Sequence, residues 1–218
     1  MLTTLAAPAF AKTWYIEDGD ITVKASDTGN DVTQKDKTTY GDKDTIITNR
    51  KEDASSNTVT IEAEKKDDKV EVTLKDVNID TSSRKKAAVS VTGEGDTNIK
   101  LNGDNALKSD IYRSGIYGSG SGSLTISGGE NDSLTAQGGS GANGISSSGS
   151  LTISGDENDS LTAQGGDSRN GIYSVSGDVT ISGGTVTATG GNSTGSYGSG
   201  GDGIHSGKIG RASCRERV

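Results

Sequence analysis

Cysteine, histidine and proline are almost absent from this sequence. Its 218 residues include one cysteine, one histidine and one proline, and 4% of them are aromatic. Zinc sites and catalytic triads are nearly excluded, because both need several residues of the missing types. The one cysteine, Cys214, lies in a C-terminal segment that is set apart below, so we expect neither a disulfide nor thiol catalysis.

Long hydrophobic runs and an excess of positive charge are also missing. Hydrophobic residues make up 28% of the chain, and no apolar run is long enough to span a bilayer. The formal net charge is −8, which argues against nucleic acid as a partner, because phosphate binding needs a basic surface. Glycine is abundant, with 33 residues, and the evenly placed β-type apolar residues favour an ordered repeat over disorder.

The two ends differ from the rest of the chain. Residues 1–11 are mostly apolar and small and end in Ala9-Phe10-Ala11, which predicts the remnant of a truncated signal peptide with cleavage after Ala11. We therefore expect a secreted or cell-surface protein. Lys208 to Val218 resembles translated sequencing-adapter sequence, and we exclude it from the fold prediction.

A near-verbatim repeat dominates the second half of the chain. Ser121 to Gly139 has the sequence SGSLTISGGENDSLTAQGG, and Ser148 to Gly166 repeats it 27 residues later with one difference, Asp156 in place of Gly129. Each unit contains three short segments, GI, SLTIS and SLTAQ, in which apolar and polar residues alternate as in a strand. Gly, Ser and Asn between them suit sharp corners.

Three short strands per unit predict one triangular turn of a parallel β-solenoid. Successive turns stack at about 4.8 Å, so equivalent side chains form columns, with the Leu/Val, Ile and Ala positions facing inward. We predict one domain over residues 12–207, with charged, less regular coils at 12–110 and Gly-rich regular repeats at 111–207. The total is about five to six coils. A separate small β-sandwich in the N-terminal half is the alternative.

The chain resembles a family of secreted clostridial-type proteins that contain a carbohydrate-binding domain. The resemblance rests on VEVTLKDVNID, GSLTISGG and NGIYSVSGDVTISGGTVTATGG. It implies a right-handed parallel β-helix that binds acidic or cellulosic plant polysaccharide and carries calcium. The Asp-Gly-Ile sequence of that family is present at Asp202, a metal ligand by this resemblance, whereas Asn143 and Asn170 replace the aspartate in two other copies.

Acidic ENDS corners are the first candidate site. In-register stacking would place Glu130 over Glu157 and Asp132 over Asp159. Like carboxylates about 5 Å apart repel each other unless a cation lies between them, and calcium prefers such oxygen ligands. We therefore predict calcium at these corners. The alternative is a solvated loop, and no known calcium-loop motif is present.

Tyrosines form the second candidate site. The residue after each inward Ile should face outward, which gives the row Tyr117, Ser146, Tyr173 and His205. Rings two coils apart, about 9.6 Å, could stack on sugar faces. Tyr112 and Tyr197 are expected at the edge of this row, and the alternative is that the tyrosines only cover a glycine-rich surface.

These patterns predict non-catalytic binding of a polysaccharide of the cellulose or polygalacturonate type. A structural stalk or adhesin is the main alternative, because near-identical repeats suit a spacer. A polysaccharide lyase is the second alternative, but Arg113 and Arg169 are the only basic residues between 111 and 207 and neither lies in an acidic cluster. We also expect end-to-end self-association, because an open solenoid end exposes unpaired strand edges.

Overall fold

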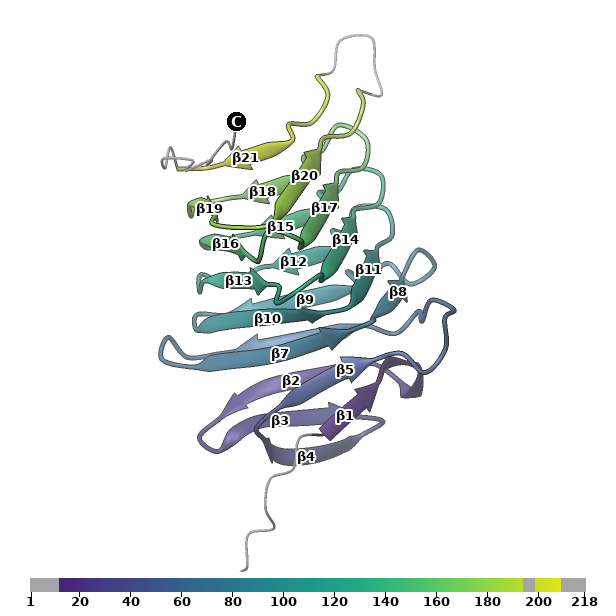
Figure 1. Cartoon of the computed structure of the whole chain (residues 1–218), viewed down its shortest axis with the longest axis vertical. Coiled ribbons are helices and arrows are strands. Elements are labelled where there is room, and N and C mark those ends of the chain that lie inside the picture. Colours follow the sequence, from purple (N-terminus) through teal and green to yellow (C-terminus); the bar gives the residue numbers. More distant parts are fainter. Residues whose placement is uncertain (1–11, 194–198, 209–218) are drawn as a thin grey trace, which may run out of the picture.

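Short strands wind the chain into a parallel β-solenoid of about five turns, described for residues 12–193 and 199–208 by a computed structural model (Figure 1). A regular turn contributes one strand to each of three sheets, and strands of successive turns pair in parallel. The predicted all-β solenoid is therefore confirmed. In the described ranges, no helix is long and apolar enough to cross a membrane.

The three sheets run along the solenoid axis. The seven-stranded sheet contains β1 (Lys12–Tyr15), β5 (Thr45–Thr48), β7 (Lys69–Lys75), β10 (Asp96–Asn102), β13 (Leu124–Ser127), β16 (Leu151–Ser154) and β19 (Val179–Ile181). The five-stranded sheet contains β8 (Asn78–Asp80), β11 (Asp104–Lys108), β14 (Ser133–Gln137), β17 (Ser160–Gln164) and β20 (Thr185–Thr189). The nine-stranded sheet contains β4 (Lys37–Asp42), β3 (Gly29–Gln34), β2 (Ile21–Ser26), β6 (Val59–Ala63), β9 (Val89–Gly93), β12 (Ile116–Gly118), β15 (Ile145–Ser147), β18 (Ile172–Ser174) and β21 (Ile204–Ser206).

Identical apolar residues stack in the interior. Leu124 pairs with Leu151, and Ile126 pairs with Ile153, as the repeat predicts. The predicted column of alanines is also present, because Ala163 pairs with an alanine on each side along the five-stranded sheet. These inward side chains belong to one continuous buried cluster. Since side chains alternate along a strand, this register fixes which residues face solvent.

Glycine at the corners has a steric cause. At Gly166 an added Cβ would overlap the carbonyl oxygen of Gly139 in the preceding turn. Backbone therefore lies directly on backbone at this corner, and any larger residue would force the two turns apart. Repeated corners of this kind account for much of the high glycine content.

The charged N-terminal coils belong to the same three sheets as the regular repeats. β7 pairs with β10, which in turn pairs with β13, so the seven-stranded sheet passes from one half to the other without interruption. The sequence did not predict the hairpin of β3 and β4, which extends the nine-stranded sheet in antiparallel fashion beyond β2 (Figure 1). Buried Trp14 donates a hydrogen bond of 2.9 Å from Nε1 to Oδ2 of Asp42 at the end of this hairpin.

The stacked core makes a direct prediction about stability. Ile126 is 1% exposed and lies between equivalent isoleucines of the turns before and after it. Ile126→Ala should lower the free energy of unfolding by about 2–5 kcal/mol, because it opens a cavity in a column that cannot collapse. Urea unfolding followed by circular dichroism measures this. Thr125→Ala, on the outward side of the same strand, should cost less than about 1 kcal/mol, and equal losses for the two variants would contradict the register.

Candidate functional site

The predicted outward row lies on the nine-stranded sheet. Tyr117 is paired in register with Ser90 on one side and Ser146 on the other. Tyr173 follows Ser146 and is paired with His205, whose ring centroid lies 5.3 Å from that of the tyrosine. The register therefore places the two tyrosines two coils apart on one face, as expected.

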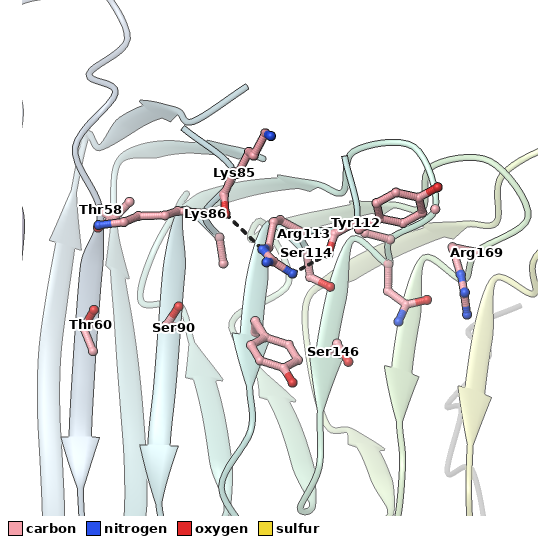
Figure 2. Close-up of a pocket in the computed structure, with 15 residues that line it drawn as sticks. Thr58, Thr60, Lys85, Lys86, Ser90, Tyr112, Arg113, Ser114, Ser146 and Arg169 are labelled. Carbon is pink, nitrogen blue, oxygen red and sulfur yellow. Dashed lines mark hydrogen bonds between the residues drawn. The ribbon is translucent and has the colours of Figure 1, made fainter. Parts of the chain in front are cut away.

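A groove of about 550 Å³ runs along this face, between the strands and the corner loops that lead into them. It contains the predicted binding residues Tyr112 and Tyr117, which are 71% and 45% exposed. Figure 2 shows Thr60, Ser90 and Ser146 on the strands that form its floor. A second hollow of about 260 Å³ continues the line and contains Tyr173 and His205. Tyr197 lies outside the described residues.

The groove wall is built by a corner conformation that recurs in four turns. The residue four positions before the first inward residue of the strand has a positive φ in each case: Lys85 (55°), Tyr112 (60°), Gly141 (76°) and Ser168 (57°). A left-handed residue at the same place in each turn repeats the same bend. Side chains at this position therefore project in a row beside the strands.

Gly141 makes room for the ring of Tyr112. A Cβ added to Gly141 would lie 2.6 Å from Cε1 of Tyr112, so the ring covers the glycine of the next turn. The tyrosine thus lies against the backbone of the adjacent corner and still exposes most of its surface. Sequence inspection placed Tyr112 near the row but could not show that a glycine one turn later seats its ring.

Asparagines two residues further along the corner form a hydrogen-bonded ladder. Asn143 Oδ1 accepts the backbone N–H of Asn170 at 2.9 Å, and Asn170 Oδ1 accepts that of Asp202 at 2.7 Å. Each side chain ties its turn to the following turn. The Asp202 carboxylate is bonded to His205 Nδ1 at 2.9 Å. Asn143 and Asn170 replace the aspartates expected by resemblance, and their side chains hold the groove wall in place.

The ENDS corners use their aspartates to bind backbone. Asp132 and Asp159 are each 6% exposed. Asp132 accepts the N–H groups of Gly103 at 2.8 Å and Gly129 at 2.6 Å, and Asp159 accepts that of Asp132 at 2.8 Å and that of Asp156 at 2.7 Å. Each carboxylate therefore binds one N–H group of its own corner and one of the preceding turn. This interaction stabilises the corner.

The geometry does not gather the predicted calcium ligands. Glu130 and Glu157 are exposed at the ENDS corners, whereas Asp202 lies at the corner that precedes the nine-stranded sheet. Within the described residues, no group of three or more Asp, Glu, His or Cys side chains is arranged to hold a metal ion. The carboxylates of Asp132 and Asp159 are directed at N–H groups, which is the wrong donor arrangement for a cation. Calcium binding stays a prediction from sequence.

Basic residues along the groove are the feature that the sequence analysis missed. Lys85, Lys86, Arg113 and Arg169 all line it. The sequence could have indicated this cluster through spacing. Lys86, Arg113 and Arg169 each lie three residues before the first inward residue of a strand. The overall negative charge concealed this local cluster.

Asp20 anchors one end of the groove wall through an ion-pair network. Arg84 contacts its carboxylate at 2.6 Å and Lys86 at 3.0 Å, although Asp20 lies 64 and 66 residues earlier in the chain. Burial raises the pKa of Asp20, but hydrogen bonds from Arg84, the Thr58 backbone and Lys86 outweigh it and lower the pKa from 3.8 to about 2. The network therefore joins β2 to a corner two turns away.

Comparisons of this chain with protein-family models, with curated proteins and with solved structures gave no match. The resemblance to the clostridial-type carbohydrate-binding family therefore stays a prediction from sequence, as do secretion and end-to-end association. The residues predicted as a signal peptide remnant, and most of the segment that resembles adapter sequence, lie outside the described residues.

The Asp20 network predicts a pH-dependent contribution to stability. Because its pKa falls from 3.8 to about 2 on folding, the stabilisation is complete above pH 3.8 and is lost as the pH falls through about 2. Asp20→Asn should lower stability by about 1 kcal/mol at pH 7, since the network is partly exposed, and should have no effect below pH 2. Thermal unfolding between pH 1.5 and 7 measures the difference. Asp67→Asn, an exposed carboxylate, is the control, and a pH-independent effect of Asp20→Asn would contradict the assignment.

The Asp132 corner predicts a loss of stability that calcium does not repair. Asp132→Asn replaces one acceptor oxygen with an amide that faces a backbone N–H, which should cost about 1–3 kcal/mol. Glu130→Gln, at an exposed position of the same corner, should be close to neutral. Thermal unfolding in calcium and in chelator measures both variants. A calcium-dependent rise in the midpoint of the wild-type protein that Glu130→Gln abolishes would instead establish the predicted metal site.

Proposed function

We propose that this protein binds polysaccharide without cleaving it, along the groove of the nine-stranded sheet, and that it does so outside the cell. The observation that carries the proposal is a set of three tyrosine rings on one face of the solenoid, of which Tyr112 and Tyr117 are exposed and Tyr173 is half-buried. Rings held at fixed intervals present flat apolar faces, against which the apolar faces of sugar rings can stack.

Polar groups complete a surface that suits sugar hydroxyls. Thr60, Ser90 and Ser146 line the floor between and beside the tyrosines, and Asn143 lines the wall. Hydroxyl and amide groups both donate and accept hydrogen bonds, as sugar hydroxyls do. The groove therefore combines stacking with hydrogen bonding, which is the usual composition of a site that orients a small polar ligand.

The length of the groove favours a polymer over a single sugar. The groove and its continuation extend over several turns, from Thr58 to His205. Each subsite alone would bind weakly, but one polymer chain can occupy several subsites at once, which raises the overall affinity. We propose polymers of the cellulose or polygalacturonate type as ligands.

A structural stalk remains the second candidate, and one observation favours it. The outward residues of β13 and β16 are identical, and so are those of β14 and β17, so these two turns present the same surface on two faces of the solenoid. The nine-stranded sheet differs, because its outward row changes from Ser90 to Tyr117 to Ser146. Absence of binding to every glycan would favour the stalk.

The tyrosines supply the test of the proposal. Replacing Tyr117 and Tyr173 together with alanine should weaken retention on insoluble cellulose and on polygalacturonate by roughly tenfold or more, because two stacking contacts of about 0.5–1.5 kcal/mol each are lost. Pull-down and affinity electrophoresis, in calcium and again in chelator, measure retention.

Tyr40→Ala is the matched control, because Tyr40 is 76% exposed on β4, away from the groove. This variant should bind like the wild-type protein. Equal binding by the double variant and the wild-type protein would contradict the proposal, and release of unsaturated sugars from polygalacturonate would replace it with a lyase.

A further inference from the structure

The groove carries a positive charge on a protein that is negative overall. Its lining includes two lysines and two arginines and no aspartate or glutamate, whereas the formal net charge of the chain is −8. From this we infer that the groove selects acidic polysaccharide, and that arginine and lysine side chains bind the carboxylates of its sugar units directly. The inference rests on the proposed function and specifies its ligand class.

Three of the four cations have no carboxylate partner among the described residues. Lys86 is bonded to Asp20, but Lys85, Arg113 and Arg169 appear in no ion pair within the described ranges. Arg113 donates from Nε to the Lys85 carbonyl at 3.0 Å and from Nη1 to the Tyr112 carbonyl at 3.2 Å (Figure 2). Those two bonds hold its guanidinium at the wall, and Nη2 makes no hydrogen bond within the described residues.

Acidic residues beside the groove wall are bonded to other groups. Asp110 accepts the backbone N–H groups of Lys85 at 3.1 Å and Ile111 at 2.7 Å. Asp167 accepts the Ser140 hydroxyl at 2.8 Å and lines a different hollow, beside the five-stranded sheet. Asp202 lines the hollow that contains Arg169 and Tyr173, and its Oδ2 is bonded to His205 Nδ1 at 2.9 Å. Within the described residues, none of these three carboxylates forms an ion pair with Arg113 or Arg169.

Arginine and tyrosine occur together on the same turns. Arg113 stands four residues before Tyr117, and Arg169 stands four residues before Tyr173. On the turn between them, Ala142 and Ser146 occupy the equivalent positions. The groove therefore repeats a pair made of one guanidinium and one ring every two turns, or about 9.6 Å.

This pair matches the chemistry of a uronate unit. The apolar face of the sugar ring can lie on the tyrosine, and the carboxylate can accept two parallel N–H bonds from the arginine. A polymer of such units would meet the same pair again two turns later, which adds the contributions of the two subsites.

A pair of polymers with the same backbone tests the inference. Polygalacturonate and its fully methyl-esterified form differ in charge but not in ring stacking. Arg169→Gln should weaken binding to polygalacturonate roughly tenfold or more and leave binding to the esterified polymer unchanged, because only the first offers a carboxylate. Salt at 0.5 M should weaken the wild-type interaction with polygalacturonate and not with the ester. Affinity electrophoresis in chelator measures all combinations, so that calcium bridging does not contribute.

Matched variants keep the test independent of folding. Lys85→Gln should show the same selective loss, whereas Lys69→Gln, which removes the same charge from an exposed position of β7 on another sheet, should have no effect.

Equal binding of the two polymers by the wild-type protein would overturn the charge selectivity and leave the proposed function standing. Binding to neither polymer nor cellulose would overturn both. Tighter binding to single-stranded DNA or to dextran sulfate than to polygalacturonate would overturn the assignment of a carboxylate ligand.

Discussion

Parallel backbone hydrogen bonding between successive turns, in register, is the constraint on which the rest of this structure depends. Once Leu124 is paired with Leu151, every later residue of both turns has a defined neighbour. Inward columns form the core, and outward columns form faces whose chemistry repeats at the rise of one turn, about 4.8 Å. The tyrosine row, the cationic wall and the corner ladders are all consequences of this register.

The corners hold the register by three different means. Glycine, as at Gly166, allows backbone to lie on backbone. Asp132 and Asn143 bind N–H groups of a neighbouring turn with their side-chain oxygens. Residues such as Lys85 adopt a left-handed conformation and direct their side chains to the groove wall. The acidic character of the protein is thus partly structural, because some of its carboxylates are used to bind backbone.

Periodicity made the fold predictable from sequence, whereas the use of each side chain was not. The 27-residue repeat and the alternation in SLTIS and SLTAQ predicted the strands, the columns and the outward row of Tyr117 and Tyr173. The hairpin of β3 and β4 was missed because it has no counterpart in the repeat. Asp132 was predicted as a metal ligand because stacked carboxylates repel each other, but the sequence could not show that its carboxylate accepts backbone N–H groups of its own corner and of the preceding turn. The cationic wall was missed for a related reason, since Lys85 and Arg169 lie far apart in the chain and come together only when the turns stack.

The register itself can be measured without disturbing the core. In a Cys214→Ser background, Thr125→Cys combined with Thr152→Cys places two thiols on outward positions that are directly paired, about 4.8 Å apart along the axis. A short thiol-specific cross-linker should join this pair quickly, and should join Thr125→Cys with Ser154→Cys slowly, because the second pair is offset by two residues along the strand. Equal rates for the two pairs, or faster reaction of the offset pair, would contradict the stacked register and with it the groove that depends on it.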